Sequence, residues 1–266
     1  ILSMLAGQLA PSEGSIYIGG TIGYMLQKDY LLQWRSIRSN ALLGLEIQKK
    51  LTPENIAYVD TLLTQYGLGD FKNSLPNQLS GGMRQRAALI RTLAVRPDIL
   101  LLDEPFSALD AKIRAQMREE LKKIQEELKI TVVFVTHDQE EAMALSHRIV
   151  VMNKGVIEQI GTPTEIYDHP ASRFVASFIG EMNFLPDGGV KTLAVRPEDV
   201  IVTKGDVSGE KKGYVRTVMV LGHYVEVNVE SDGQIIKTYV PKGAEEEFKP
   251  RDLVSMKFIK TYEYCA

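Results

Sequence analysis

The segments Leu79–Met83 (LSGGM) and Ile99–Glu104 (ILLLDE) decide the fold of this chain. The first places a Ser-Gly-Gly turn before residues 83–95, whose apolar spacing is helical. The second runs through four large aliphatic residues, as expected of a strand that is buried on both faces, and ends in two adjacent carboxylates. A helix that leads into such a strand is typical of an open, mostly parallel sheet with helices on both sides.

The flanking sequence extends this α/β pattern in both directions. Residues 111–129 predict an amphipathic helix, because apolar residues recur every three or four positions. The other expected elements are a helix over residues 2–9, short strands over 14–24 broken at Gly19-Gly20, helices over 31–79 broken at Pro53, Gly67 and Pro76, a second buried strand over 131–135 and a helix over 139–146.

The pattern changes near Phe184, where β-rich segments alternate with polar turns. The expected strands cover residues 193–195, 214–220, 224–229, 235–240 and 253–258, with turns at 231–233 and 242–243 and an exposed loop at 245–247. The domain boundary is expected between Gly180 and Gly189. We therefore predict a first domain over residues 1–182, with a helical subdomain at about 31–95, and a small antiparallel β domain over residues 183–266.

Composition restricts the partners of the chain. Its 266 residues carry a formal net charge of −3, so no basic surface suggests nucleic acid as the main partner. The longest apolar runs, such as residues 99–102 and 130–135, are far too short to cross a bilayer, so membrane association requires another protein. The single Cys265 excludes an internal disulfide and fits a reducing cytoplasm, and we take its thiol as incidental.

Asp103 and Glu104 are the first candidates for chemistry. Ligands of α/β sheets bind at the carboxyl ends of the strands, and adjacent strand residues point to opposite sides. In phosphoryl transfer, one carboxylate can hold Mg2+ while the other orients and polarises the attacking water. The alternative is that the pair only begins a turn before Pro105.

Three further segments carry weaker signals of the same chemistry. Ser80-Gly81-Gly82 opens a helix whose free N–H groups suit a phosphate, although an ordinary helix start capped by Ser80 has the same sequence. His137 follows the strand expected at 131–135 and reaches the same sheet edge, where it can bond a phosphate oxygen or serve a structural role. Gln27 follows an apolar segment and can reach a metal ion or a water.

The order and spacing of these residues resemble the ABC ATPase family over essentially the whole chain. Gln27 matches the Q-loop, and Leu79–Met83 matches the LSGGQ signature with methionine at its last position. Ile99–Glu104 matches Walker B with the catalytic glutamate, Ser107-Ala108-Leu109-Asp110 matches the D-loop, and His137 matches the switch histidine. The resemblance implies a P-loop NTPase-type sheet with a helical subdomain, followed by a small OB-like β domain.

The resemblance also implies a head-to-tail dimer that closes on ATP and Mg2+ at its interface. Glu104 would act as general base, while His137 and Gln27 would sense the γ-phosphate. The residues implied in ATP binding are Ser80, Gly81, Gly82, Asp103 and Asp110, and those implied in binding Mg2+ are Asp103 and Gln27.

The family's partners follow from the same resemblance. They are a second ATPase subunit, two transmembrane permease subunits and, indirectly, an extracytoplasmic solute-binding protein. This places the chain as a peripheral subunit on the cytoplasmic face of the cell membrane, with no nucleic-acid partner. Trp34 and Arg35 lie where the family meets the membrane subunit, although Trp34 can equally be a core residue of the helical subdomain.

One element of the family is missing from the sequence. No GxxxxGK[ST] string, the Walker A loop that holds the β- and γ-phosphates, occurs in the 266 residues. In the family this loop precedes a helix that resembles Ile1–Leu9. We expect an N-terminally truncated chain that is inactive in ATP hydrolysis by itself; the alternative is a degenerate subunit.

Two parts of the chain resemble different importers. Gln159–Gly180 and Ala194–Asp199 are similar to bacterial importer ATPases with a C-terminal TOBE domain, above all the spermidine/putrescine group. Leu31–Gly44 and Leu75–Leu109 are more similar to nitrate, taurine or sulfonate importer ATPases. We predict uptake of a polyamine-like solute. The alternatives are a nitrate, taurine or sulfonate importer, an ABC ATPase outside transport, or a catalytically inactive module.

Overall fold

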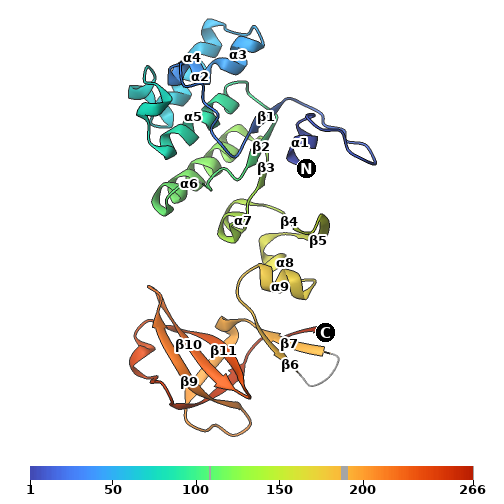
Figure 1. The fold of residues 1–266 in the computed structure, drawn as a ribbon, viewed down its shortest axis with the longest axis vertical. Helices are drawn as coiled ribbons and strands as arrows, with labels where there is room; N and C mark the ends of the chain where they lie inside the picture. The colour runs from blue at the N-terminus through green and yellow to red at the C-terminus, as the bar shows by residue number, and fades with distance from the viewer. Residues whose placement is uncertain (108, 187–190, 266) are drawn as a thin grey trace. The chain divides into compact units, whose positions relative to one another are not determined.

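The computed structural model describes residues 1–107, 109–186 and 191–265 (Figure 1). It consists of two compact units, Ile1–Leu145 and Ser146–Ala266. Ala108 of the predicted D-loop and Gly189, one limit of the predicted domain boundary, lie outside the described residues.

A parallel sheet forms the centre of the first unit. Its strands follow the order β1-β2-β3, with β1 at Ile22–Met25, β2 at Ile99–Asp103 and β3 at Thr131–Val135. Strand β2 is central, and Leu100, Leu101 and Leu102 are at most 1% exposed. The predicted buried parallel strand is therefore confirmed, and the carboxyl ends of all three strands meet at one edge.

Helices pack on this sheet (Figure 1). They are α1 (Leu2–Leu5), α5 (Gly81–Leu93) and α6 (Ala111–Leu128), and α7 (Gln139–Leu145) contacts α6. Figure 1 shows α5 and α6 on one side of the sheet and α1 on the other. Helix α6 buries Met117, Leu121 and Ile124, which lie on one face because they are spaced four and three residues apart. The predicted α/β fold with helices on both sides is confirmed.

The helical subdomain follows β1. Its elements are α2 (Ile37–Ala41), α3 (Leu43–Ile47), α4 (Pro53–Gln65) and the short 3-10 turns η1 (Gly69–Phe71) and η2 (Pro76–Gln78). Arg38 of α2 donates Nε–H and Nη2–H to the two carboxylate oxygens of Asp60 in α4, at 2.6 and 2.8 Å. This hydrogen bonding lowers the pKa of Asp60, so the pair is charged at neutral pH and joins the two helices.

Two local predictions for this unit were wrong. The helix expected over residues 2–9 ends at Leu5, because the chain turns into a left-handed conformation at Gly7 (φ +72°). Residues 14–20 form no strand, so only the last part of the expected 14–24 segment pairs as β1. The predicted break at Pro53 is confirmed, because α3 ends at Ile47 and Pro53 begins α4, where a proline loses no hydrogen bond.

Strand β3 also differs from its prediction. Its side chains alternate in exposure, with Val133 at 37% and Val135 at 44%. The reason is its position, because β3 pairs with β2 at one edge and with no other strand among the described residues. An apolar sequence alone does not distinguish a central strand from an edge strand.

The second unit is rich in antiparallel strands. Its first part contains the hairpin β4 (Ile149–Asn153) and β5 (Val156–Gly161), followed by helices α8 (Pro163–Asp168) and α9 (Arg173–Phe178). A three-stranded sheet has the order β13-β7-β6, from Tyr262–Cys265, Lys191–Val195 and Asn183–Pro186. A five-stranded sheet has the order β11-β10-β9-β12-β8, from Gln234–Pro241, Tyr224–Ser231, Lys211–Val220, Leu253–Phe258 and Val200–Lys204.

The five-stranded sheet curls so that its outer strands approach each other. Thr238 of β11 donates its hydroxyl hydrogen to the carbonyl oxygen of Val200, the first residue of β8, at 2.5 Å. The valines at 225, 227 and 229 of β10 are fully buried, as expected when one strand face covers a core. The five predicted strands of this region are confirmed, whereas β4, β5, β6, β8 and β13 were missed.

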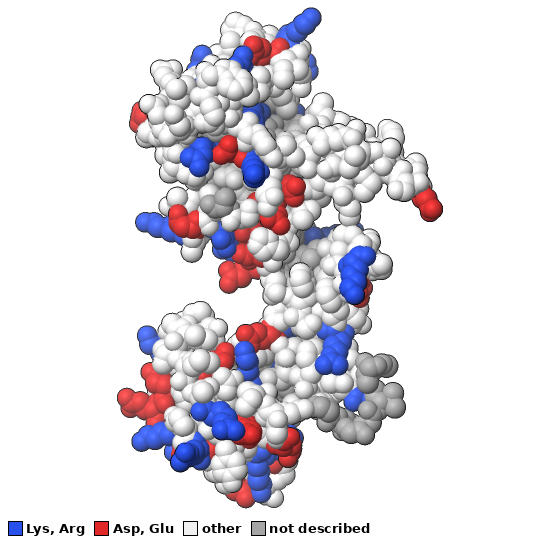
Figure 2. Space-filling view, viewed as in Figure 1, with Lys and Arg blue, Asp and Glu red and all other residues white. Residues whose placement is uncertain are grey.

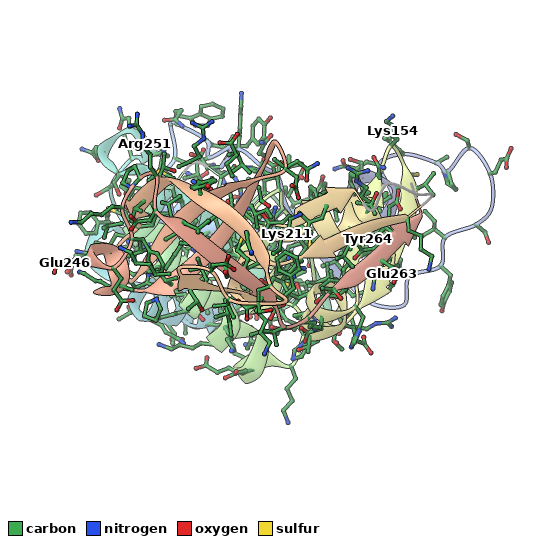
Figure 3. The ribbon with its side chains drawn as sticks, turned by 90° about the horizontal axis from the view of Figure 1, so that it is seen from below. Lys154, Lys211, Glu246, Arg251, Glu263 and Tyr264 are labelled. Carbon is green, nitrogen blue, oxygen red and sulfur yellow. The ribbon has the colours of Figure 1, made fainter. Side chains whose placement is uncertain are left out.

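Strand β13 shows the same alternation in the smaller sheet. Figure 3 labels Glu263 and Tyr264, two adjacent residues of this strand. Glu263 accepts a hydrogen bond from Lys191 at the surface, whereas Tyr264 is buried in a cluster with Ala176 of α9 and Ala194 of β7. The predicted boundary at residue 183 is the start of β6, and the separate domain over 183–266 stays a prediction.

Charges of both signs alternate over the face drawn in Figure 2. This distribution agrees with the small net charge of −3. Among the residues that the structure describes, no helix has the length and apolarity that a membrane span requires.

Arg196, which precedes the 3-10 turn η3 (Pro197–Asp199), is the largest of the fully buried side chains and is 1% exposed. Its Nη1 donates to the carbonyls of Ile179 and Glu181, at 2.9 and 3.2 Å, and its Nη2 donates to that of Tyr167, at 2.8 Å. The guanidinium also lies 3.7 Å from the centre of the Tyr167 ring. One side chain thus fastens the ends of α8 and α9 to the segment after β7.

We predict that Arg196→Lys lowers the free energy of unfolding of the second unit by about 2–4 kcal/mol, since an ammonium group cannot replace the planar fork and leaves buried carbonyls without partners. Chemical denaturation measures this change. Arg216→Lys is the matched control, because Arg216 is 61% exposed and pairs with Glu230 at the surface; its cost should stay below about 0.5 kcal/mol. Equal losses in the two variants would contradict the prediction.

Candidate functional site

Three predicted residues meet at the carboxyl edge of the parallel sheet. Gln27 Nε2 donates a hydrogen bond to Glu104 Oε2 at 2.7 Å, and His137 Nδ1 lies 3.2 Å from Glu104 Oε1. Each residue follows a different strand, and the parallel pairing of β1, β2 and β3 brings them together. Both carboxylate oxygens of Glu104 are therefore engaged by neighbours on either side.

The backbone fixes Glu104 in an unusual conformation. Its φ is +44°, in the left-handed region that non-glycine residues rarely adopt. Its N–H donates to the carbonyl of Val135 at 2.9 Å, and its carbonyl accepts hydrogen bonds from the N–H and hydroxyl of Ser107, at 3.2 and 3.0 Å. A strained backbone that its surroundings hold in place is typical of functional residues.

A small cavity lies beside Glu104 and His137. Its volume is about 30 Å³, enough for a water molecule, and its lining is polar. The residues that line it are Glu104, Ser107, Arg114, Thr136, His137, Asp138 and Glu141. A carboxylate and an imidazole beside a space for water form an arrangement that can take a proton from that water.

The Ser-Gly-Gly turn lies at the start of α5. Ser80 Oγ accepts a hydrogen bond from the N–H of Met83 at 3.3 Å, so the serine caps the helix as an ordinary helix start requires. The two glycines differ. A Cβ on Gly82 would lie 2.6 Å from Cγ2 of Ile113 in α6, whereas a Cβ on Gly81 would meet only Arg84 Nη2, at 4.0 Å. Gly82 thus permits helix packing, whereas a methyl group on Gly81 would make only an ordinary contact.

Comparisons with known proteins place this chain in a family. Residues 1–107 match the family model described as "ABC transporter". The sulfate/thiosulfate import ATP-binding protein CysA of Synechococcus elongatus is 40% identical over 91% of this chain and 77% of its own length. The protein of the same name from Pseudomonas aeruginosa is 43% identical over 88% of this chain and 76% of its own length. The chain belongs to the ABC transporter ATP-binding proteins.

Solved structures agree with this assignment. An ABC transporter of the metal-chelate type in an inward-facing conformation aligns with a TM-score of 0.61 over 90% of this chain and 80% of that chain, at 20% identity, which shows the fold. The dimeric ATP-binding cassette MJ0796, bound to ADP and Pi, aligns with a TM-score of 0.54 at 31% identity over 61% of this chain and 78% of that chain. ABC ATPases bind ATP with Mg2+ and hydrolyse it to drive transport, so both predicted cofactors and the predicted enzyme class are confirmed.

Oxygen ligands suited to Mg2+ stand at the same edge of this ABC ATPase. Asp103 ends β2 and is half-buried, and its side chain points to the opposite side from that of its neighbour Leu102. The side-chain amide nitrogen of Gln27 donates a hydrogen bond to Glu104, so the amide oxygen remains as a ligand for a cation. Carboxylate and amide oxygens are the donors that Mg2+ prefers, so these two residues fit the ion.

Asp110 lies at the start of α6 and caps this helix. Its Oδ1 accepts hydrogen bonds from the N–H groups of Lys112 and Ile113, at 3.1 and 3.0 Å. The hydrogen bonds that join Gln27, Glu104 and His137 do not include Asp110. Its predicted contact with ATP stays a prediction, beside an observed role as a helix cap.

Sequence reasoning missed the residues of α5 that hold the segment after β1. Gln85 is 4% exposed and donates to the carbonyl of Gln27 at 3.4 Å. Arg91 Nη2 donates to the carbonyl of Asp29 at 2.6 Å, and Arg84 Nε donates to the Asp29 carboxylate at 3.1 Å. The two arginines are seven residues apart, a spacing that places them on one helix face and was the available signal.

The exposure of Trp34 decides between the two interpretations of this residue. It is 76% exposed, so the interpretation of Trp34 as a core residue of the helical subdomain is wrong. Its neighbour Arg35 instead forms an ion pair with Glu46, Nη1 to Oε2, at 2.6 Å. The indole is left at the surface of the helical subdomain, where a partner protein can cover it.

We predict that Gly82→Ala lowers the free energy of unfolding by about 1–3 kcal/mol, because the β-branched side chain of Ile113 cannot turn away without shifting α6. Gly81→Ala is the matched control and should change stability by less than about 0.5 kcal/mol. Thermal and chemical denaturation of both variants measure the difference. Similar stability of the two variants would show that the glycines have the same role.

Proposed function

We propose that this chain is the ATP-hydrolysing subunit of an ABC importer and that Glu104 is its general base. The observation that carries this proposal is the arrangement of Gln27, Glu104 and His137 around one carboxylate, beside a polar cavity large enough for water. Glu104 would accept a proton from the attacking water. The water oxygen would then attack the γ-phosphorus, and ADP would leave.

The neighbouring residues divide the remaining tasks. His137 is 72% exposed in its side chain, and its contact with Glu104 through Nδ1 leaves Nε2 for an oxygen of the γ-phosphate. Asp103 and Gln27 would hold Mg2+, which neutralises phosphate charge when bound. Ser80, Gly81, Gly82 and Asp110 would contact the nucleotide held by a second subunit.

The proposed assembly contains a second ATPase subunit in head-to-tail orientation. The dimeric structure of MJ0796, 31% identical to this chain, supports a dimer, and the head-to-tail orientation is part of the proposal. Two permease subunits would sit in the membrane, with the ATPase on its cytoplasmic face and a solute-binding protein outside. The exposed Trp34, beside Arg35, would contact a permease subunit.

The transported solute is a separate question. The relatives reported above carry the name sulfate/thiosulfate import ATP-binding protein and are 40% and 43% identical to this chain. We therefore propose a sulfate-type oxyanion as the solute in preference to the polyamine that the sequence predicted. Residues 183–266 would form a TOBE-like regulatory domain, supported by the curled antiparallel sheet that Thr238 joins to Val200.

We predict that Glu104→Gln lowers kcat for ATP hydrolysis by at least ~100-fold in an assembled transporter whose ATPase subunit carries a Walker A loop, because the amide cannot accept a proton, while KM for ATP stays within about twofold. Release of phosphate under multiple turnover measures kcat. Glu140→Gln is the matched control, since the Glu140 side chain is 83% exposed on α7 and should keep full activity. Turnover by the Glu104→Gln protein near the unmodified rate would refute Glu104 as general base.

We predict that disruption of the gene in cells that encode this chain abolishes uptake of radiolabelled sulfate and leaves uptake of putrescine unchanged. Complementation with the unmodified gene should restore sulfate uptake, and complementation with the Glu104→Gln gene should not. Loss of putrescine uptake with normal sulfate uptake would instead support the polyamine importer.

A further inference from the structure

Arg114 of α6 connects the two segments that carry Glu104 and His137. Its Nη2 donates to the carbonyl of Leu109, in the segment after β2, at 3.1 Å. Its Nη1 donates to the carboxylate of Asp138, in the segment after β3, at 3.1 Å. The planar guanidinium therefore bridges two loops, because each of its two Nη atoms donates to one of them.

Asp138 also forms hydrogen bonds with residues other than Arg114. Its Oδ1 accepts a hydrogen bond from the N–H of Glu141 at 3.2 Å, and its own N–H donates to Thr136 Oγ1 at 3.0 Å. The Thr136 hydroxyl in turn donates to Glu141 Oε2 at 2.5 Å. Both sequence neighbours of His137 thus belong to one hydrogen-bond network, whose outer contact is Arg114.

The network is largely shielded from water. The side chains of Arg114, Asp138 and Glu141 are 29%, 23% and 4% exposed, and all three line the cavity beside Glu104. Arg114 Nε lies 3.9 Å from Glu141 Oε1, so one cation serves two carboxylates. Burial raises the pKa of Glu141, as expected for a carboxyl group in such a place. Interactions among partly desolvated charges hold geometry more firmly than exposed ion pairs.

We propose that Arg114 is a positioning residue for ATP hydrolysis, which sets the place of His137 relative to Glu104 by joining Asp138 to the Leu109 carbonyl. This inference rests on the proposed function of Glu104 and His137. Arg114 touches neither of the two side chains through a hydrogen bond, so its effect passes through the loops. Misplacement of a reacting group by a fraction of an ångström is enough to slow an enzyme.

The test compares Arg114→Gln, Asp138→Asn and the double variant in the assembled transporter, with kcat, KM for ATP and melting temperature measured for each. Each single change should lower kcat about 10-fold or more, since the chemistry is misaligned, with KM for ATP within about twofold. The double variant should be no slower than the slower single variant, because both changes break the same connection. Arg114→Lys should recover only part of kcat, as an ammonium cannot reach both acceptors.

Arg118→Gln is the matched control. Arg118 lies one helical turn further along α6 and pairs with Glu140, Nη1 to Oε2, at 3.5 Å. This variant should keep the unmodified kcat. Equal loss of kcat in the Arg118→Gln and Arg114→Gln proteins would overturn the proposal.

The remaining outcomes separate this inference from the proposed function. A lower melting temperature with unchanged kcat per folded molecule would make Arg114 merely structural and overturn the proposal. Normal turnover by Glu104→Gln refutes the general base itself, whereas inactive Glu104→Gln beside fully active Arg114→Gln refutes only the positioning role. If Arg114→Gln does not fold, Asp138→Asn decides, because asparagine retains the cap of α7 and removes the charge.

Discussion

The parallel pairing of β1, β2 and β3 is the constraint on which the site depends. In register, Met25 lies beside Leu102, and Leu102 lies beside Phe134. Parallel strands in this register end at the same edge, so the residues that follow them become neighbours although they are far apart in the sequence. Burial of β2 on both faces stabilises this arrangement, since its three central leucines are removed from water.

Helix α5 connects this edge to the helical subdomain. It begins at the Ser-Gly-Gly turn, and its buried polar side chains hold the segment that contains Gln27. Close packing against Ile113 of α6 fixes the start of the helix. Arg84 of the same helix donates to the carbonyl of Leu79 and to the carboxylate of Asp29, so it joins the segment before α5 to the segment after Gln27.

The predicted residues differ in how closely the structure connects them. Gln27, Glu104 and His137 form one hydrogen-bonded group, whereas Ser80 and Asp110 cap helices. A local sequence pattern identifies a cap and a ligand turn equally well, because both require a free N–H group at a helix start. The network of Arg114, Asp138 and Glu141 had no sequence signal, because its members come from α6, from the segment after β3 and from α7 and act across space.

The sequence by itself determined the family, the α/β fold and the residues that follow each strand of the parallel sheet, because apolar runs, turns and motif spacing are local properties of the chain. Tertiary structure alone decided that β3 is an edge strand, that Trp34 is exposed and that Gly82 is required by Ile113. It also decided that Arg114 bridges two loops and that Arg196 is buried among carbonyls. Burial and partnership depend on which distant segments come into contact, and residue type alone does not specify that.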